Sequence, residues 1–374
     1  MAGGAAEGLA EELDRVYPEL AAVREVAEQP VFLVGGAVRD LLLGRGRSDI
    51  DLVVVGDAAG LAEQLGAEVV SHERFATAKV SLDGHEVDIA TARSESYPHP
   101  GSLPVVEPTD NVEADLARRD FTVNAMAIPL DGASELIDPY DGRADLDVGQ
   151  LRILHPRSFE DDPTRALRAA RYAARFGFEL ESRTEGLLRT ADLGTVSADR
   201  RDAELLRLAG EAEATRAFAL LGEWGLVELR AGGVELATRA DQLLASRPWD
   251  GLTPRDGALF VAALGPPGGE EALAEAKPGR PSEAVALAVK HDPVELVLAR
   301  ALGAEWLDRY LAEWRDVALE IDGGDLIAAG LPQGPALGRG LEEALRRKLD
   351  GEIGGREQEL EAALEAARSG DGVA

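Results

Sequence analysis

The chain has 374 residues, no cysteine and a net charge of −30. This length allows two or more domains, and the absence of cysteine excludes disulfides and thiolate metal sites, as is typical of a reducing compartment. No signal peptide is recognisable and no stretch reaches about 18 apolar residues, so we expect a cytoplasmic protein without a membrane span. The large negative net charge disfavours binding of nucleic acid, although a local basic strip can still bind RNA.

The first 150 residues predict a mixed α/β head. Short apolar runs rich in valine and isoleucine alternate with segments of helical periodicity, and glycines separate them. The elements expected first, in chain order, are a helix over 7–27, a strand over 31–34, a helix over 37–43, a strand over 50–55 and a helix over 58–66.

Antiparallel strands and then helices are expected in the rest of the chain. The run TAKVSLDGHEVDIATA predicts a hairpin that turns at Asp83-Gly84. Residues 94–113 contain four prolines and predict a long loop. From Arg157 onward alanine, leucine and arginine recur with helical spacing, and an exposed connection is expected at 266–282. The sequence therefore predicts an α+β fold whose three parts are a head over 1–150, a helical neck over 151–215 and a helical body with a tail over 216–374.

Two aspartates open the second predicted strand, in the stretch FLVGGAVRDLLLGRGRSDIDLVVVGD. Asp49 and Asp51 are two positions apart, so their side chains point to the same face of the strand. Like charges this close are unfavourable unless a cation lies between them, and Mg²⁺ is the cation that prefers such oxygen ligands. The pair therefore predicts a magnesium site, although a solvent-exposed strand end is the simpler alternative.

A glycine pair precedes this site by one helix. Gly35 and Gly36 allow backbone N–H groups to approach an anion closely, and the helix that follows directs its positive end to the same place. Arg39, one turn into that helix, adds a guanidinium fork for phosphate. A phosphate cradle beside metal-binding carboxylates predicts nucleotidyl transfer assisted by two metal ions. Neither a dinucleotide fingerprint nor a Walker A loop is present.

A third carboxylate is expected from a neighbouring strand. The run EVDIATAR offers Glu86 and Asp88, which share one face of the strand. We expect Asp88 to complete the site with Asp49 and Asp51, while Glu86 remains an alternative.

The motif G-G-A-V-R-D-x-x-x-G-x-x-x-x-D-I-D-L resembles the first motif of the class II tRNA nucleotidyltransferase and bacterial poly(A) polymerase family, within the polymerase β superfamily. Further motifs follow in the family's order. RRDFTVNAMA (118–127) resembles the ribose-binding motif, DPYDGRADL (138–146) the flexible connecting motif, and DDPTRALRAARY (161–172) the base-recognition motif. Residues 330–352 resemble the C-terminal helical segment more loosely. An HD phosphohydrolase motif is absent from the sequence.

The resemblance implies a role for each matching residue. Arg119 reaches the triphosphate, Asp120 and Asn124 bind the ribose, and Asp162 and Arg165 pair with the edge of the incoming base. Asp161 stands where the family usually has glutamate, which shortens one side chain by a methylene. The arginines at helical spacing lie on one face and predict a basic strip, to which Arg200 and Arg201 are added; its members in the helix are Arg165, Arg168, Arg171 and Arg175.

The implied activity is addition of the 3′-terminal CCA to tRNA from CTP and ATP, with Mg²⁺ as cofactor and the acceptor arm of tRNA bound by the helical body. Addition of A alone, of CC alone or of a poly(A) tail remains an alternative within the family. Nucleotidyl transfer to a small molecule and a non-catalytic RNA-binding module are alternatives from other classes. The sequence leaves the oligomeric state open.

Overall fold

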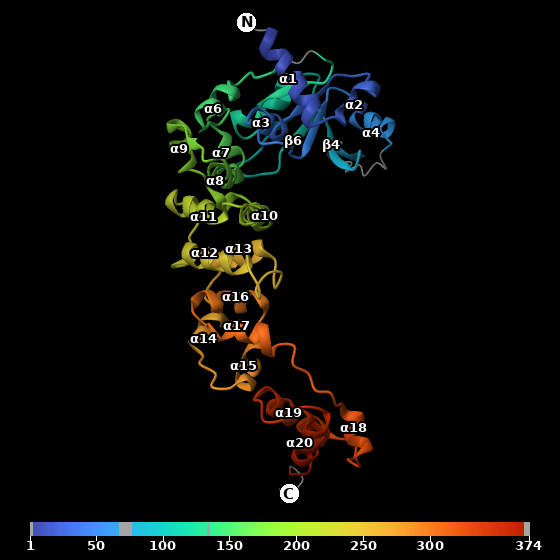
Figure 1. Cartoon of the computed structure of the whole chain (residues 1–374). Helices are drawn as coiled ribbons and strands as arrows, with labels where there is room; N and C mark the ends of the chain where they lie inside the picture. The colour runs from blue at the N-terminus through green and yellow to red at the C-terminus, as the bar shows by residue number, and fades with distance from the viewer. Residues whose placement is uncertain (1–2, 67–76, 133–134, 370–374) are drawn as a thin grey trace. The chain divides into compact units, whose positions relative to one another are not determined.

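The computed structural model describes residues 3–66, 77–132 and 135–369 (Figure 1). The chain divides into two compact units, residues 1–227 and 228–374, and each is described by itself. Within the described residues no helix is long and apolar enough to cross a membrane. The finer boundaries at 150 and 215 stay predictions.

A five-stranded mixed sheet forms the centre of the first unit, in the order β3-β4-β2-β1-β7. Only the pair β2–β4 is parallel, and the other three pairs are antiparallel. The alternate apolar residues of these strands are buried, Leu33, Leu52 and Ile89 among them. The strands are β1 (Val31–Val34), β2 (Ile50–Val54), β3 (Thr77–Leu82), β4 (His85–Thr91) and β7 (Ala127–Pro129).

The predicted hairpin and the helix after the glycine pair are confirmed. Strands β3 and β4 meet at Asp83 and Gly84, whose φ angles of 49° and 82° are those of a tight hairpin turn with both central residues left-handed. Helix α3 (Gly36–Leu42) follows β1 directly, and α4 (Ala58–Gln64) follows β2. The bounds of β1, α3, β2 and α4 therefore agree with the predicted bounds to within two residues.

The helix predicted over 7–27 is wrong as one element. The structure has two helices there, α1 (Gly3–Val16) and α2 (Leu20–Val26). Pro18 interrupts the helical pattern because proline has no N–H to donate and excludes the helical conformation of the residue before it. Tyr17 is buried at this break, and its hydroxyl lies 3.2 Å from Oγ of Ser48. The break thus places an apolar ring against the segment that leads into β2.

The loop predicted over 94–113 is also wrong in part. Strands β5 (Arg93–Ser96) and β6 (Val105–Pro108) pair antiparallel within it, and α5 (Val112–Ala117) begins there with Asn111 as its cap. Three of the four prolines lie in the connection between the two strands, and Pro108 ends β6, where the strand has no second neighbour. Such an edge position tolerates a residue that has no N–H.

Helices complete the first unit after the sheet. Helix α8 packs against α10 and α11, and its buried face carries Leu167, Ala170 and Ala174. Two short strands, β8 (Gln150–Leu151) and β9 (Glu179–Leu180), pair beside it. The remaining elements of the unit are η1 (Thr122–Asn124), α6 (Gly142–Val148), α7 (Ser158–Asp161), α8 (Thr164–Phe176), α9 (Ser182–Leu188), η2 (Leu193–Thr195), α10 (Ala198–Ala209) and α11 (Ala214–Glu223).

The described part of the second unit is helical throughout, as the sequence predicts. The exposed connection expected at 266–282 is wrong in part, because α14 lies inside it. Helices α19 and α20 form a hairpin whose contact includes Gly340, since a Cβ there would lie 2.5 Å from the carbonyl oxygen of Ala363. The elements are α12 (Gly233–Leu244), α13 (Arg255–Leu264), α14 (Gly269–Glu275), α15 (Pro281–Ala288), α16 (Pro293–Leu302), α17 (Trp306–Arg309), η3 (Tyr310–Trp314), α18 (Gly323–Ala328), α19 (Pro335–Leu349) and α20 (Arg356–Ser369).

Candidate active site

A cavity of about 550 Å³ lies in the first unit, between the glycine turn of α3, the start of β2 and helix α8. Of the predicted site residues, all but Asp88 line it: Gly35, Gly36, Arg39, Asp49, Asp51, Arg119, Asp120, Asn124, Asp162, Arg165, Arg168 and Arg171. Residues separated by more than a hundred positions in the chain thus meet around one space. Their individual roles stay predictions, but the geometry brings them together.

The predicted aspartate pair lies at the start of β2. Asp49 immediately precedes this strand and Asp51 is its second residue. Asp88 of β4 is the direct Cα partner of Asp51 across the parallel pair, whereas Glu86 pairs with Ser81 on the other side. The register therefore favours Asp88 over Glu86 as the neighbour of the aspartate pair.

The three carboxylates do not converge on a single point. Nowhere in the described ranges do three or more His, Asp or Glu side chains stand in a metal-ligating group. Asp88 instead lies 3.4 Å from Nζ of Lys79, which also lies 3.8 Å from Glu86. Asp49 and Asp51 therefore supply the cavity lining with hard oxygen donors. Asp88 does not line the cavity, and its charge affects Asp51 from the neighbouring strand.

The electrostatics of Asp51 fit a cation. Desolvation by the surrounding protein raises the pKa of Asp51, and the charges of Asp88 and Asp49 raise it further, against the opposing charge of Arg119. The side chain is nevertheless exposed to the open cavity. Because like charges make the ionised form unfavourable, a divalent cation at this place would relieve the repulsion, and the oxygen donors are those that Mg²⁺ prefers.

The glycine turn is closed by an arginine. Gly35 has a φ of +70°, and a Cβ at this position would lie 2.6 Å from Nη1 of Arg119. A larger residue here would be strained at this φ and would displace the guanidinium of Arg119. The guanidinium of Arg119 therefore lies directly over the turn that leads into α3.

Two adjacent arginines share one buried anchor that the sequence analysis missed. Asp115 of α5 is fully buried, and its carboxylate accepts from Arg118 at 2.9 Å and from Arg119 at 3.1 Å. Burial acts to raise the pKa of Asp115, but the charges of Arg118 and Arg119 and the N–H of Arg93 hold it below its usual value. Asp115 thus stays ionised and fixes both guanidinium groups at the cavity.

The predicted ribose residues contact one another. Asp120 lies just before the short helix η1, and Nδ2 of Asn124 donates to its Oδ1 at 2.9 Å. Its Oδ2 lies 2.7 Å from Nη2 of Arg168. Although burial acts to raise the pKa of Asp120, the charge of Arg168 and the hydrogen bond from Asn124 lower it. Asp120 is therefore an ionised acceptor at the cavity wall.

The predicted base-selecting pair is held by the protein around it. Oδ1 of Asp162 accepts from Oγ1 of Thr164 at 2.7 Å and from Nη2 of Arg200 at 3.0 Å. Arg165 is 4% exposed, and it donates to Oγ of Ser158 at 2.8 Å and to the carbonyl of Arg118 at 2.7 Å. Both side chains are thus fixed while they still line the cavity.

Three of the four arginines in the predicted stripe of α8 are partnered by acidic groups. Arg168 pairs with Asp120, and Arg171 and Arg175 lie 3.4 Å and 3.5 Å from Glu211. The cavity lining nevertheless holds eight arginines against five acidic residues, so the cavity is basic within an acidic chain. The lining residues that the sequence analysis did not single out are Arg93, Glu95, Tyr97, Pro104, Arg118 and Tyr172.

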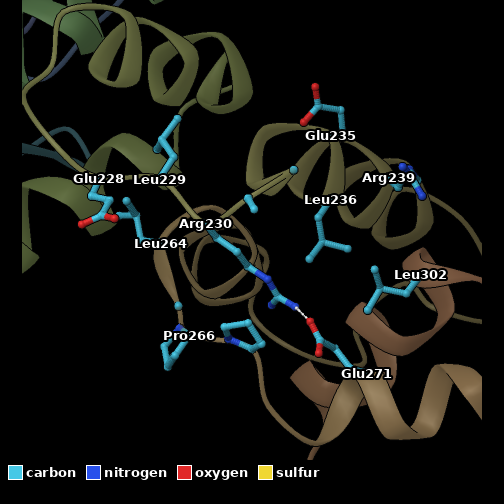
Figure 2. A pocket seen from close by; sticks show the side chains of 14 residues that line it. Glu228, Leu229, Arg230, Glu235, Leu236, Arg239, Leu264, Pro266, Glu271 and Leu302 are labelled. Atoms are coloured by element: carbon cyan, nitrogen blue, oxygen red, sulfur yellow. Dashed lines mark hydrogen bonds and ion pairs between the residues drawn. The ribbon is translucent and has the colours of Figure 1, made fainter.

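A second cavity, of about 750 Å³, lies within the second unit (Figure 2). Arg230 points into its centre and lies 2.7 Å from Glu270 and 3.1 Å from Glu271. Leu236, Leu302 and Pro266 surround Arg230 and Glu271 in Figure 2. The charged groups at its centre satisfy one another, so the arrangement suited to chemistry is the one in the first unit.

Comparison with known proteins agrees with the motifs. Residues 31–152 match the poly(A) polymerase head domain. A CC-adding tRNA nucleotidyltransferase from Deinococcus radiodurans is 34% identical over 365 residues, which are 93% of this chain and 92% of that protein. An A-adding tRNA nucleotidyltransferase from Halalkalibacterium halodurans is 45% identical over 204 residues, 51% of this chain and 48% of that protein. The chain spans about half the length, or less, of the A-adding relatives it matches.

Solved structures extend the likeness to the whole chain. A CCA-adding enzyme in an apo form has a TM-score of 0.79 and 30% identity, and the match covers 94% of this chain and 95% of that one. A CCA-adding enzyme in complex with CTP has a TM-score of 0.77 and 27% identity over 98% of both chains. The Thermotoga maritima CCA-adding enzyme in complex with tRNA has a TM-score of 0.72 and 29% identity, over 96% of this chain and 97% of that one. With a relative matched along nearly its full length and three of the family motifs gathered on one cavity, this chain belongs to the class II tRNA nucleotidyltransferase family.

Proposed function

We propose that this protein adds the 3′-terminal CCA to tRNA from CTP and ATP. The observation that carries the proposal is one basic cavity that unites the Asp49–Asp51 pair, the glycine turn under Arg119 and the Asp162–Arg165 pair. Two carboxylates beside a phosphate cradle suit nucleotidyl transfer, and a charged donor and acceptor opposite them suit selection of a base. The neighbouring complexes with tRNA and with CTP support the same substrates.

Different residues of this chain bind different parts of the nucleotide. Asp49 and Asp51 would hold Mg²⁺, which supplies charge neutralisation and activation of the attacking hydroxyl when it is bound. Arg119 and the N–H groups of the glycine turn bind the triphosphate. The 3′-hydroxyl of the tRNA attacks the α-phosphate, a new phosphodiester bond forms, and pyrophosphate leaves as its bond to that phosphate breaks.

Other residues of the same cavity bind the sugar and the base. Asp120 and Asn124 hydrogen-bond the ribose, and Asp162 and Arg165 pair with the edge of the base. Discrimination follows because a wrong base does not match the acceptor of Asp162 and the donors of Arg165. The helical body holds the acceptor arm by its phosphates and shape, as suits a cytoplasmic enzyme that acts on many tRNAs.

Addition of CC alone is the second candidate. It is favoured by the full-length match to the Deinococcus radiodurans relative, which is a CC-adding enzyme. The two activities share the same motifs, so the cavity residues are compatible with both.

Primer extension separates these functions. Purified protein is incubated with tRNA lacking CCA and with tRNA ending in CC, each with CTP, with ATP or with both. CCA addition predicts three added nucleotides on the first tRNA and one A on the second. CC addition predicts two added C residues and no A on either tRNA, and a protein that extends neither substrate contradicts the proposal.

A further inference from the structure

A chain of buried polar contacts connects α3 with α8. Nη1 of Arg39 donates to Oδ1 of Asn124 at 2.6 Å, and Nδ2 of Asn124 donates to Oδ1 of Asp120 at 2.9 Å. Oδ2 of Asp120 lies 2.7 Å from Nη2 of Arg168. Arg39, Asn124 and Asp120 are each 5% exposed or less, so water has little access to these contacts.

The contacts leave Asn124 one orientation. A guanidinium only donates and an ionised carboxylate only accepts, so the amide satisfies both neighbours only with its oxygen towards Arg39 and its nitrogen towards Asp120. Asp120 is kept ionised by Arg168 and by this same hydrogen bond. Arg39 therefore sets the orientation of Asn124, and through Asn124 it secures the position of Asp120.

Arg39 itself is engaged on several sides. Its Nε donates to Oδ1 of Asp40 at 2.9 Å, and the guanidinium carbon lies 4.3 Å from the ring centroid of Phe176 and 5.4 Å from that of Tyr172. The sequence predicts this arginine as a fork for the triphosphate. In the structure its Nε and Nη1 already donate to protein acceptors, and its Nη2 lies 3.5 Å from where a Cβ on Gly36 would be. Arg119 lies closer to the glycine turn, with Nη1 at 2.6 Å from where a Cβ on Gly35 would be.

We propose that Arg39 is a positioning residue for sugar selection, and that it does not bind the triphosphate. It holds Asn124 and Asp120 in the geometry that accepts the 2′-hydroxyl of the incoming ribonucleotide, and Asp40 anchors it from behind. This inference rests on the proposed nucleotidyl transfer. A nucleotide without the 2′-hydroxyl gains no hydrogen bond from these groups, and a site built to bind a hydroxyl discriminates against the analogue that lacks it.

The test measures kcat/KM for CTP and for dCTP on tRNA lacking CCA, together with the inhibition constant of pyrophosphate. In Arg39→Gln the ratio of CTP to dCTP is expected to fall about tenfold, the order of one lost hydrogen bond to a charged group, because CTP loses its sugar contact and dCTP has none to lose. Inhibition by pyrophosphate is expected to stay within about twofold. The matched control, Arg119→Gln, is expected to show the reverse, with weaker pyrophosphate inhibition and an unchanged ratio.

A second variant keeps the test valid if Arg39→Gln fails to fold. Asp40→Asn has the same shape but withdraws the charge that anchors Nε of Arg39, and its thermal unfolding midpoint shows whether the fold is retained. We expect the CTP to dCTP ratio to fall here as well, by a smaller factor.

Two results overturn the inference. One is weaker pyrophosphate inhibition with an unchanged sugar ratio in Arg39→Gln, which makes Arg39 a triphosphate ligand. The other is an unchanged ratio in folded Asp40→Asn and Arg39→Gln. If the wild-type protein extends no tRNA, the proposed function fails by itself, and calorimetric binding of CTP and dCTP to the same variants tests the role of Arg39 separately.

Discussion

Asp51 and Asp88 stand opposite each other on the parallel strands β2 and β4, as direct Cα partners. The charge of Asp88 contributes to the raised pKa of Asp51, although desolvation contributes more. This relationship explains how a carboxylate outside the cavity lining affects the pair within it.

The first prediction separates the three carboxylates. Asp49→Ala and Asp51→Ala are expected to reduce primer extension by at least about 10³-fold. Each variant removes an oxygen donor for the metal, which stabilises the transition state by several kcal/mol. Asp88→Asn is expected to cost about 10- to 100-fold, since it changes the charge beside the pair without removing a lining residue.

Glu86→Gln is the control for this series. The Glu86 side chain is 81% exposed, so the variant is expected to keep activity within about twofold of the wild type. Magnesium titrations of all four variants show whether lost activity follows lost metal affinity. Full activity in a folded Asp49→Ala, Asp51→Ala double variant contradicts the assigned site.

The second prediction concerns the space above the glycine turn. Gly35→Ala adds a Cβ at 2.6 Å from Nη1 of Arg119, at a backbone φ of +70°. We expect the KM for CTP to rise about tenfold or more, because the arginine must leave its place over the turn. Gly44→Ala is the matched control, since Gly44 has a φ of +63° but nothing within 4 Å of the added carbon.

Both alanine variants carry backbone strain of about 1 kcal/mol or more, because each residue has a positive φ. Thermal unfolding measures the stability that each variant loses, while only Gly35→Ala is expected to change nucleotide binding. Equal KM values in the two variants contradict the role of the turn.

Much of the sheet was predictable because its strands are apolar runs bounded by glycine. β1 and β2 lie within two such runs, and Asp83-Gly84 marks a turn by local chemistry alone. The ribbon of β5 and β6 was not predictable, since β5 is polar and half-buried while β6 is largely exposed and ends in proline. Their pairing depends on contacts across the ribbon and not on a local apolar pattern.

The site shows the same division. The motifs indicate which residues meet at the cavity, but not what each side chain contacts. Arg39 and Asn124 are 85 positions apart, and no spacing rule connects them. Asp115 lies three residues before Arg118, and in the sequence nothing distinguishes it from an ordinary exposed position of a helix. Its burial is visible only when α5 is placed beside β5.

The third prediction concerns this buried anchor. Asp115→Asn keeps the shape of the side chain but removes the charge that holds Arg118 and Arg119. The inhibition constant of pyrophosphate is expected to rise about tenfold or more while the KM for tRNA is unchanged, because the arginines lose their fixed orientation towards the triphosphate.

Loss of a buried charge also destabilises the fold, so the control must share that effect. Glu270→Gln removes a buried carboxylate from its arginine in the second unit, and Glu270 does not line the nucleotide cavity. It is expected to lower the unfolding midpoint without changing pyrophosphate inhibition. A parallel loss of pyrophosphate inhibition in both variants shows that Asp115 acts through general stability only.

The fourth prediction concerns choice of base. In Asp162→Ala the acceptor at the cavity wall is lost, together with the hydrogen bond from Arg200. Incorporation of CTP and ATP is expected to fall about 10- to 100-fold, and preference over GTP and UTP to narrow by a similar factor. Arg201→Ala is the control, because Arg201 pairs with the exposed Asp202 and does not line the cavity. An unchanged nucleotide preference in Asp162→Ala shows that this residue does not read the base.

The fifth prediction concerns the acid stability of the second unit. The side chains of Arg230 and Glu270 are 5% exposed or less, and Arg230 also donates to Glu271 at 3.1 Å. Glu270→Gln removes one of these two charged partners of Arg230, so it is expected to cost about 1.5–3 kcal/mol of unfolding free energy. Burial acts to raise the pKa of Glu270, but backbone hydrogen bonds and Arg230 hold it below its usual value.

A carboxylate whose pKa is lower in the folded than in the unfolded state stabilises the fold above its unfolded pKa, and this contribution is lost as the pH falls towards the folded value. Denaturant unfolding followed at Trp249 and the other tryptophans, between about pH 7 and 3, should therefore show a steeper loss of stability in the wild type than in Glu270→Gln. Equal slopes mean that Glu270 titrates alike in the folded and unfolded chains, in which case its pair with Arg230 contributes no pH-dependent stability.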